Sequence, residues 1–145
     1  MSAIQHKTYI KVPPEKVYTT LTTAEGWNAW FTDETSFHGT EYIRLRWSEY
    51  GEGSKDVEDG GRILKAIPHQ NFTFQWSPGD NPTTVSFHLE SYEKGTLVTL
   101  SETGYSNSDT DVVACIGCAA GWGEALTLLK FYLEYGIVCK EDLKA

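Results

Sequence analysis

The hydrophobic positions of this chain change their spacing three times between its two ends. Apolar residues alternate weakly over residues 4–12, which predicts a strand. Pro13 and Pro14 end that strand, since proline has no N–H for a ladder but its fixed φ suits the first turn of a helix. A short helix is expected next, followed by a second one that carries Trp27, Trp30 and Phe31.

The middle of the chain has the period of two that is typical of strands with one apolar face. Strands are expected over residues 42–48, 62–67, 71–76, 85–89 and 97–102. The acidic, glycine-rich segment 49–61 is expected to form a turn at a hairpin end. Strands joined by short turns predict an antiparallel meander, here of about six or seven strands.

A long amphipathic helix is predicted near the end of the chain. Asp109 and Asp111 are both good N-cap candidates, and Gly136 is a plausible C-cap after Tyr135. The apolar stripe at spacings of three and four consists of Cys115, Cys118 or Ala119, Trp122, Leu126, Leu129 and Leu133. The pattern predicts an α+β fold, in which two short helices follow the first strand and the last helix buries one face.

Composition and charge narrow the classes of partner. A length of 145 residues suits one domain, so residues 1–145 are expected to fold together. The net charge of −8 disfavours nucleic acid and anionic membranes. No apolar run approaches the ~20 residues that cross a bilayer, and no signal peptide is recognised. With three cysteines and no disulfide framework, a cytoplasmic location is expected.

Four segments resemble, in the same order, the START-like (SRPBCC, helix-grip) domains. They are VPPEKVYTTLTTAEGWNAWF, GGRILKAIPHQNFTFQW, GTLVTLSETGY and GWGEALTLLKFYLEYG, and they cover nearly the whole chain. The subfamily that the chain resembles best is the C-terminal domain of the activator of heat-shock protein 90 ATPase and its stand-alone bacterial relatives. The resemblance implies a curved antiparallel sheet wrapped around the last helix, with a cavity between them. It does not imply one function, because relatives bind lipids, hormones and polyketides and a few are cyclases.

A hollow between sheet and helix is the predicted ligand site. The apolar side chains expected to line it are Trp30, Phe31, Leu45, Trp47, Phe74, Trp76, Phe87, Val98, Leu100, Trp122, Leu126 and Leu129. Each of them alone could equally fill a solid core. As a set they favour a cavity, since bulky rings on a strongly curved sheet rarely fill space without gaps. Trp30 and Phe31 are expected at its mouth, and binding of a small hydrophobic or amphipathic ligand is the predicted function.

Glu102 is the polar candidate inside that hollow. If Val98 and Leu100 face inward, the period of two turns Glu102 inward as well, where it can act as a general acid or base or bind a ligand. The alternative is a strand that frays near Gly104 and leaves Glu102 solvated. Many relatives of the resembled family carry His or another polar residue in this segment, so no role is carried over. A cyclase or hydratase that uses Glu102 is an alternative, but enzymatic activity is not the first expectation.

Cys115 and Cys118 form a C-x-x-C motif in the first turns of the predicted helix. A redox role is one interpretation, but the small residues around the motif favour close helix–sheet packing with cysteine as an apolar filler. No second C-x-x-C or paired histidine completes a zinc site, so neither a metal nor another cofactor is expected. Arg44 and Arg46 have the opposite parity to Leu45, which predicts an outer-face position near cross-strand acids.

The expected partner is a small apolar ligand. A chaperone protein is an alternative that only the subfamily resemblance implies, and the acidic segment 49–61 suits a basic protein partner. Nucleic acid and membrane are not expected as partners. Both a monomer and a homodimer are open, because an uncovered sheet edge can support pairing.

Overall fold

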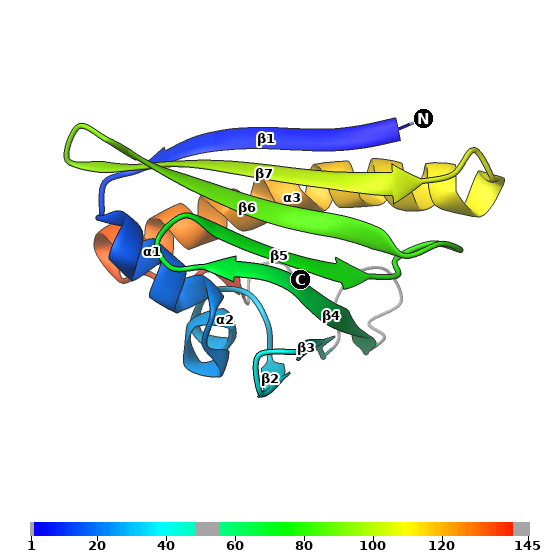
Figure 1. Ribbon diagram of the computed structural model, residues 1–145, viewed down its shortest axis with the longest axis horizontal. Coiled ribbons are helices and arrows are strands. Elements are labelled where there is room, and N and C mark those ends of the chain that lie inside the picture. The colour runs from blue at the N-terminus through cyan, green and yellow to red at the C-terminus, as the bar shows by residue number, and fades with distance from the viewer. Residues whose placement is uncertain (1, 49–55, 141–145) are drawn as a thin grey trace.

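A computed structural model describes residues 2–48 and 56–140. A curved sheet carries a long helix along one face, and two short helices lie at one end of it (Figure 1). The strands pair antiparallel in the order β1-β7-β6-β5-β4-β3-β2. Their bounds are Ser2–Ile10 (β1), Glu34–His38 (β2), Tyr42–Trp47 (β3), Val57–Ile67 (β4), Asn71–Trp76 (β5), Thr83–Tyr92 (β6) and Gly95–Tyr105 (β7). The predicted α+β helix-grip fold, with two short helices after the first strand, is confirmed.

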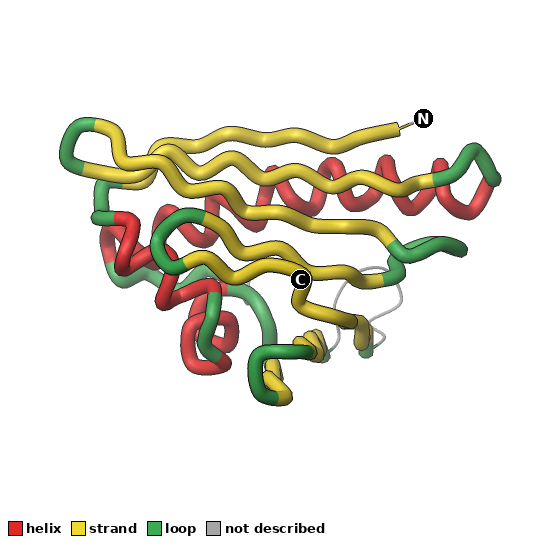
Figure 2. The backbone as a smooth tube through the Cα atoms, viewed as in Figure 1, coloured by secondary structure: helices red, strands yellow, loops and turns green. Residues whose placement is uncertain are grey.

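The two short helices are α1 (Pro14–Leu21) and α2 (Ala24–Trp30). Pro14 begins α1 as predicted, and the Thr23 hydroxyl caps α2 by accepting the Gly26 N–H at 3.1 Å. Trp27 is fully buried, and its indole N–H donates to the Leu21 carbonyl at 2.8 Å. This bond ties α2 to the end of α1, so both helices close the same end of the sheet (Figure 2).

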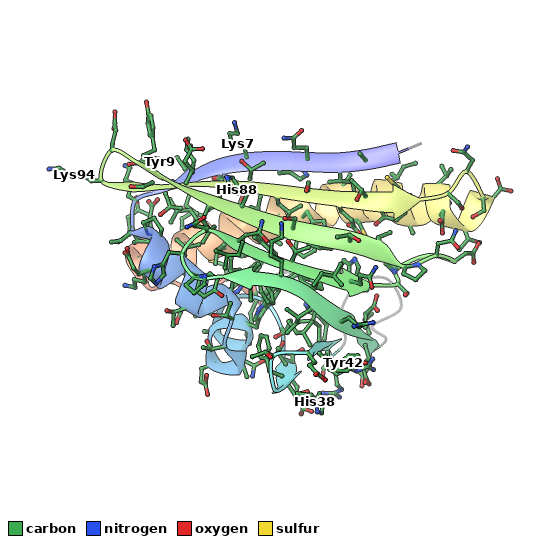
Figure 3. All side chains as sticks on the ribbon, viewed as in Figure 1. Lys7, Tyr9, His38, Tyr42, His88 and Lys94 are labelled. Atoms are coloured by element: carbon green, nitrogen blue, oxygen red, sulfur yellow. The ribbon has the colours of Figure 1, made fainter. Side chains whose placement is uncertain are left out.

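The alternation of apolar and polar positions sets the two faces of the sheet. On β3, Leu45 is buried, whereas Arg44 and Arg46 pair with Glu58 and Asp56 across the outer face, at 2.5 and 3.1 Å. Both arginine positions agree with the prediction. Figure 3 shows this outer face, on which His88 of β6 and Lys7 of β1 are exposed.

Strand β4 begins earlier than the sequence pattern predicts. Val57 already pairs with Trp47, so residues 57–61 belong to a strand rather than to the turn expected over 49–61. The two glycines make this possible: a Cβ on Gly60, whose φ is +150°, would lie 2.2 Å from the Ile43 carbonyl oxygen, and one on Gly61 2.4 Å from that of Gln75. The rest of the predicted turn, residues 49–55, lies outside the described residues.

The long helix α3 (Asp109–Tyr135) lies against β1 and fills the concave side of the sheet. Ser108, rather than Asp109 or Asp111, is its N-cap: the Ser108 hydroxyl accepts the Asp111 N–H at 3.1 Å. Gly136 ends the helix in the left-handed conformation, as predicted. The buried face consists of Asp111, Cys115, Trp122, Ala125, Leu126, Leu128, Leu129 and Leu133.

Helix α3 is also apolar enough over its length to qualify as a membrane-spanning segment. Among the described residues it is the single helix that does so, with a mean hydropathy of 1.7 over its most apolar 18 residues. The expectation that no apolar stretch approaches this length is therefore corrected. Length and composition are weak evidence for a membrane span, because the core helix of a globular protein meets the same criterion.

Candidate functional site

An apolar pocket of about 260 Å³ lies between the first half of α3 and the neighbouring ends of β3, β4 and β5. Val57 and Gly117 in its wall are exposed, so the pocket reaches the surface. Its described lining residues are Phe31, Trp47, Val57, Asp59, Trp76, Ala114, Gly117, Cys118, Gly121 and Trp122. A second hollow, between β2 and β4, is lined mostly by polar side chains, including the paired Arg44 and Glu58. The first is the better candidate for an apolar ligand.

Four aromatic side chains of the pocket wall touch one another in a closed ring. The centroid of Phe31 lies 5.2 Å from that of Trp47, and Trp47 lies 6.2 Å from Trp76. Trp76 lies 5.3 Å from Trp122, and Trp122 returns to Phe31 at 6.2 Å. We call these four residues the aromatic box: Phe31, Trp47, Trp76 and Trp122. They come from the end of α2, from β3, from β5 and from α3, so the box exists only in the folded chain.

Glu102 holds two members of the aromatic box in place. Its side chain is fully buried on β7, and the indole N–H groups of Trp76 and Trp122 donate to its two oxygens at 2.7 and 2.9 Å. The Thr83 hydroxyl adds a third bond at 2.5 Å. Hydrogen bonds to a carboxylate are shorter and stronger than those between neutral groups. Glu102 therefore fixes the orientation of both indoles, and its inward position follows the predicted parity.

Small residues on α3 form the side of the pocket opposite the strand ends. A Cβ added to Gly117 or Gly121 would meet no atom within 4 Å of it, apart from the helix itself and adjoining residues. These two glycines do not serve the close helix–sheet packing that the sequence pattern suggests. Close packing occurs instead at Gly123, where an added Cβ would lie 3.3 Å from the His6 ring. The missing side chains of Gly117 and Gly121 leave space for the pocket.

Asp59 is the single charged residue among the described residues that line this pocket. Its Oδ1 accepts the backbone N–H groups of Gly60 at 2.7 Å and Ser77 at 3.0 Å. Burial raises the pKa of its carboxyl group, although these two bonds and nearby Arg44 oppose the rise and Glu102 adds to it. A half-buried carboxylate at an apolar wall can accept a hydrogen bond from a ligand or face its positive charge.

The two cysteines of the C-x-x-C motif are free thiols, and Cys118 lines the pocket. Burial raises the pKa of Cys118 to about 11, so the thiol stays protonated at neutral pH and is a weak nucleophile. This does not favour redox chemistry. The nearby Tyr105 hydroxyl is buried and makes no well-formed hydrogen bond within the described residues. Its pKa is raised by burial first, and then by Cys118 and Glu102.

The structure divides the predicted site residues into two groups. Four of them line the pocket, and these are the aromatic box. The others are buried outside its wall: Trp30, Leu45, Phe74, Phe87, Val98, Leu100, Glu102, Leu126 and Leu129. The middle of the sheet and helix is filled because Trp27 packs edge-on against Phe74 and Phe87, at 6.2 and 6.1 Å. Ligand binding by any of these residues stays a prediction.

Sequence reasoning missed the other lining residues. Small residues on α3 carry no apolar signal, and Val57 and Asp59 lie in a segment expected to be a turn. The consecutive glycines at 60 and 61 are a weak signal that a strand with close backbone neighbours begins before residue 62. Within the described residues, no group of three His, Cys, Asp or Glu side chains is arranged to hold a metal ion.

The sequence profile of the family described as "Activator of Hsp90 ATPase homolog 1-like protein" matches residues 11–134. No curated protein matches the chain. The Aha1 dimer from Colwellia psychrerythraea is similar in structure, with 30% identity, a TM-score of 0.75 and coverage of 94% of this chain and 98% of that chain. A Staphylococcus saprophyticus protein is 25% identical, with a TM-score of 0.74 and 96% of each chain covered.

CalU16 from Micromonospora echinospora shares the fold at 20% identity and a TM-score of 0.70, over 92% of this chain and 77% of that chain. At this identity the likeness concerns the fold alone. The profile match and the 30% identical relative each cover most of the chain, and the family assignment rests on these two. The chain belongs to the activator of Hsp90 ATPase homolog 1-like family, within the START-like domains.

Proposed function

We propose that this protein binds a small apolar or amphipathic ligand in the pocket between α3 and the ends of β3, β4 and β5. The observation that carries the proposal is a pocket of about 260 Å³ walled by the aromatic box. Ligand sites are typically concave and mostly apolar, with a few polar groups that orient the ligand. This pocket has that composition, with Asp59 as its charged group.

The aromatic box is organised before any ligand arrives. Glu102 fixes the indoles of Trp76 and Trp122, and stacking on Trp30, with a centroid distance of 5.0 Å, supports Phe31. A preformed site avoids much of the entropy cost of ordering side chains on binding. At about 260 Å³ the volume is just below the usual range for ligand pockets, roughly 300–1,000 Å³, which favours a small ligand.

Filling the pocket from the helix side tests this proposal. Gly117→Leu adds a side chain where the structure has open space, so the protein should fold and binding should fall at least tenfold. Tryptophan fluorescence, titrated with a panel of small neutral and charged aromatic compounds, reports binding because three indoles line the pocket. Ala120→Leu, exposed on the same helix and outside the pocket wall, is the matched control. If no compound of the panel binds to the unmodified protein, the proposal fails.

A cyclase or hydratase function based on Glu102 has less support. Both carboxylate oxygens of Glu102 are occupied by donors, and the residue lies outside the pocket wall. A general acid or base must come within hydrogen-bond reach of the substrate. The geometry therefore favours binding over acid–base catalysis.

A second candidate function is stimulation of a chaperone ATPase, and family membership favours it. Such a partner agrees with a cytoplasmic site of action and with a role in stress response. The test is the ATPase rate of purified heat-shock protein 90 with increasing amounts of this protein. A rise in rate that saturates supports the function, and an unchanged rate at saturating concentration rejects it.

A further inference from the structure

The dimensions of the aromatic box suit a cation. Because adjacent ring centroids in the closed ring are 5.2 to 6.2 Å apart, its midpoint lies within about 6 Å of every centroid. That is the distance range over which a cation is attracted to the negative face of an aromatic ring. Three of the four rings are indoles, the side chain with the strongest attraction.

The pocket also carries a negative charge, which suits a cationic ligand. Asp59 is the single charged group among the described lining residues, and its carboxylate is held by the N–H groups of Gly60 and Ser77. Arg44, the cation that lowers the pKa of Asp59, is paired with Glu58 at 2.5 Å on the outer face of the sheet. A net charge of −8 also attracts cationic ligands from a distance.

A neutral ligand would pack against the aromatic rings but would make no electrostatic interaction with Asp59. It would leave the half-buried Asp59 carboxylate beside apolar atoms, with fewer water molecules and no new partner. Removing water from a charge without compensation opposes binding. A ligand with a positive group replaces the lost water by electrostatic attraction to Asp59 and to the ring faces. The same pocket therefore discriminates between ligands of equal size by their charge.

We propose that the pocket selects a small organic ammonium ion, a molecule whose quaternary or protonated amine lies in the aromatic box beside Asp59 while its apolar part occupies the rest of the pocket. This inference rests on the proposed ligand-binding function and names the class of ligand. The group recognised is an alkyl- or aryl-substituted ammonium.

A pair of isosteric probes tests the selection. Phenyltrimethylammonium and tert-butylbenzene have the same shape and differ in the charge on one central atom. We expect the ammonium to bind at least tenfold more tightly in a tryptophan fluorescence titration, from the usual strength of a desolvated cation–π contact. Equal or tighter binding of tert-butylbenzene overturns the inference and leaves the proposed function standing. Binding of neither probe overturns both.

Two variants assign the selectivity to Asp59. Asp59→Asn keeps an oxygen that can accept from Gly60 and Ser77, so the strand should be preserved while the charge is lost. We expect it to weaken phenyltrimethylammonium binding about tenfold and to leave tert-butylbenzene unchanged. Glu124→Gln removes an equal charge from an exposed position on α3 and should change neither affinity by more than twofold. An equal loss in both variants would show that net charge, rather than the pocket, attracts the cation, and would overturn the inference.

A competition experiment identifies the source of the ammonium group. Soluble dihexanoylphosphatidylcholine displaces phenyltrimethylammonium if the aromatic box accepts a choline headgroup. If it does not displace the probe, the ammonium group belongs to a ligand other than a phosphatidylcholine. Both results are consistent with ammonium recognition, and the isosteric pair decides whether that recognition exists.

Discussion

At Glu102, three donors from β5, β6 and α3 converge on one buried carboxylate. A buried carboxylate is costly unless hydrogen bonds replace its water. Here the donors are two indoles and one hydroxyl, and the indoles belong to the pocket wall. The residue that sequence reasoning proposed as a possible acid or base is therefore placed to position the aromatic box.

Glu102→Leu should lower the free energy of unfolding by about 3 kcal/mol, because the two indole N–H groups lose their acceptor and each unsatisfied buried donor costs about 1–3 kcal/mol. Urea unfolding followed by circular dichroism measures the change. Glu124→Leu, at an exposed position on α3, should stay within about 0.5 kcal/mol of the unmodified protein. A loss of less than about 1 kcal/mol for Glu102→Leu would mean that the indoles find other acceptors.

The same substitution at two helical glycines should have opposite effects. Gly117→Ala should raise the free energy of unfolding by about 0.5–1 kcal/mol, since the new Cβ meets open space and alanine favours a helix. Gly26→Ala in α2 should lower it, because its Cβ would lie 2.1 Å from the Thr20 carbonyl oxygen. Thermal unfolding of both variants measures whether each substitution raises or lowers the free energy of unfolding. Equal signs would contradict the assignment of Gly117 to the pocket wall and of Gly26 to a close contact.

At the scale of elements, the first turn of α3 is fastened to the β5–β6 turn by one carboxylate. Asp111 accepts the backbone N–H groups of Asp80 and Ser106, both at 2.6 Å, and the Asn81 side-chain amide at 3.3 Å. Gly79 permits this approach, because a Cβ there would lie 2.3 Å from Oδ1 of Asp111. These contacts fix the half of α3 that carries the small-residue wall of the pocket.

The Asp111 contacts predict a dependence of stability on pH. Hydrogen bonds, above all from the Ser106 N–H, lower its pKa from 3.8 to about 2. Between these values the unfolded chain binds a proton and the folded chain does not, so the stabilisation is complete above about pH 4 and declines as the pH falls to about 2. The free energy of unfolding, compared between the unmodified protein and Asp111→Asn from pH 6 down to pH 2, should show a difference that is constant above about pH 4 and shrinks as the pH falls from about 4 to about 2.

Asp109→Asn, which removes a charge from an exposed position in the same first turn of α3, controls for effects on the helix dipole. Subtraction of one curve from the other cancels the titration of distant groups, because substitutions at independent sites are nearly additive. A difference for Asp111→Asn that stays constant down to pH 2 would contradict the low pKa.

At the scale of the whole molecule, the exposed side of α3 offers a surface for self-association. Val113 is 70% exposed and Ile116 67%, both on the half of the helix that borders the pocket. Exposed apolar side chains that lie together on a surface often mark a contact site, so we expect two copies of this chain to associate through this part of α3.

Light scattering coupled to size-exclusion chromatography tests the association. A dimer should be measured for the unmodified protein, and Val113→Lys with Ile116→Lys should give a monomer, because two charges would have to lose water at the contact. Leu64→Lys, also an exposed apolar position but on β4, should leave the dimer intact. A monomer for the unmodified protein at micromolar concentration would reject the proposal.

The sequence by itself determined the order of the elements except β2, the faces of the strands and the membership of a family. Alternation on β3 placed Leu45 inward because a strand turns every second side chain to the same side, and on β7 it left both an inward and a solvated Glu102 open. It also placed the four rings of the aromatic box near a ligand, although it could not distinguish them from Phe74 and Phe87, which fill the core. The spacing of apolar residues predicts which face of a strand or helix a side chain lies on. It does not predict whether that side chain borders a cavity or packs in the filled core.

The tertiary structure decided where that space lies. Asp59 and Gly117 are 58 positions apart and show no apolar pattern, yet both line the pocket because β4 and α3 meet there. The closure of the aromatic box and the hydrogen bonds of Glu102 also depend on distances between elements far apart in the chain. A cavity is the volume that packing leaves unfilled, so it is a property of how all the elements fit together and has no signature in any one segment.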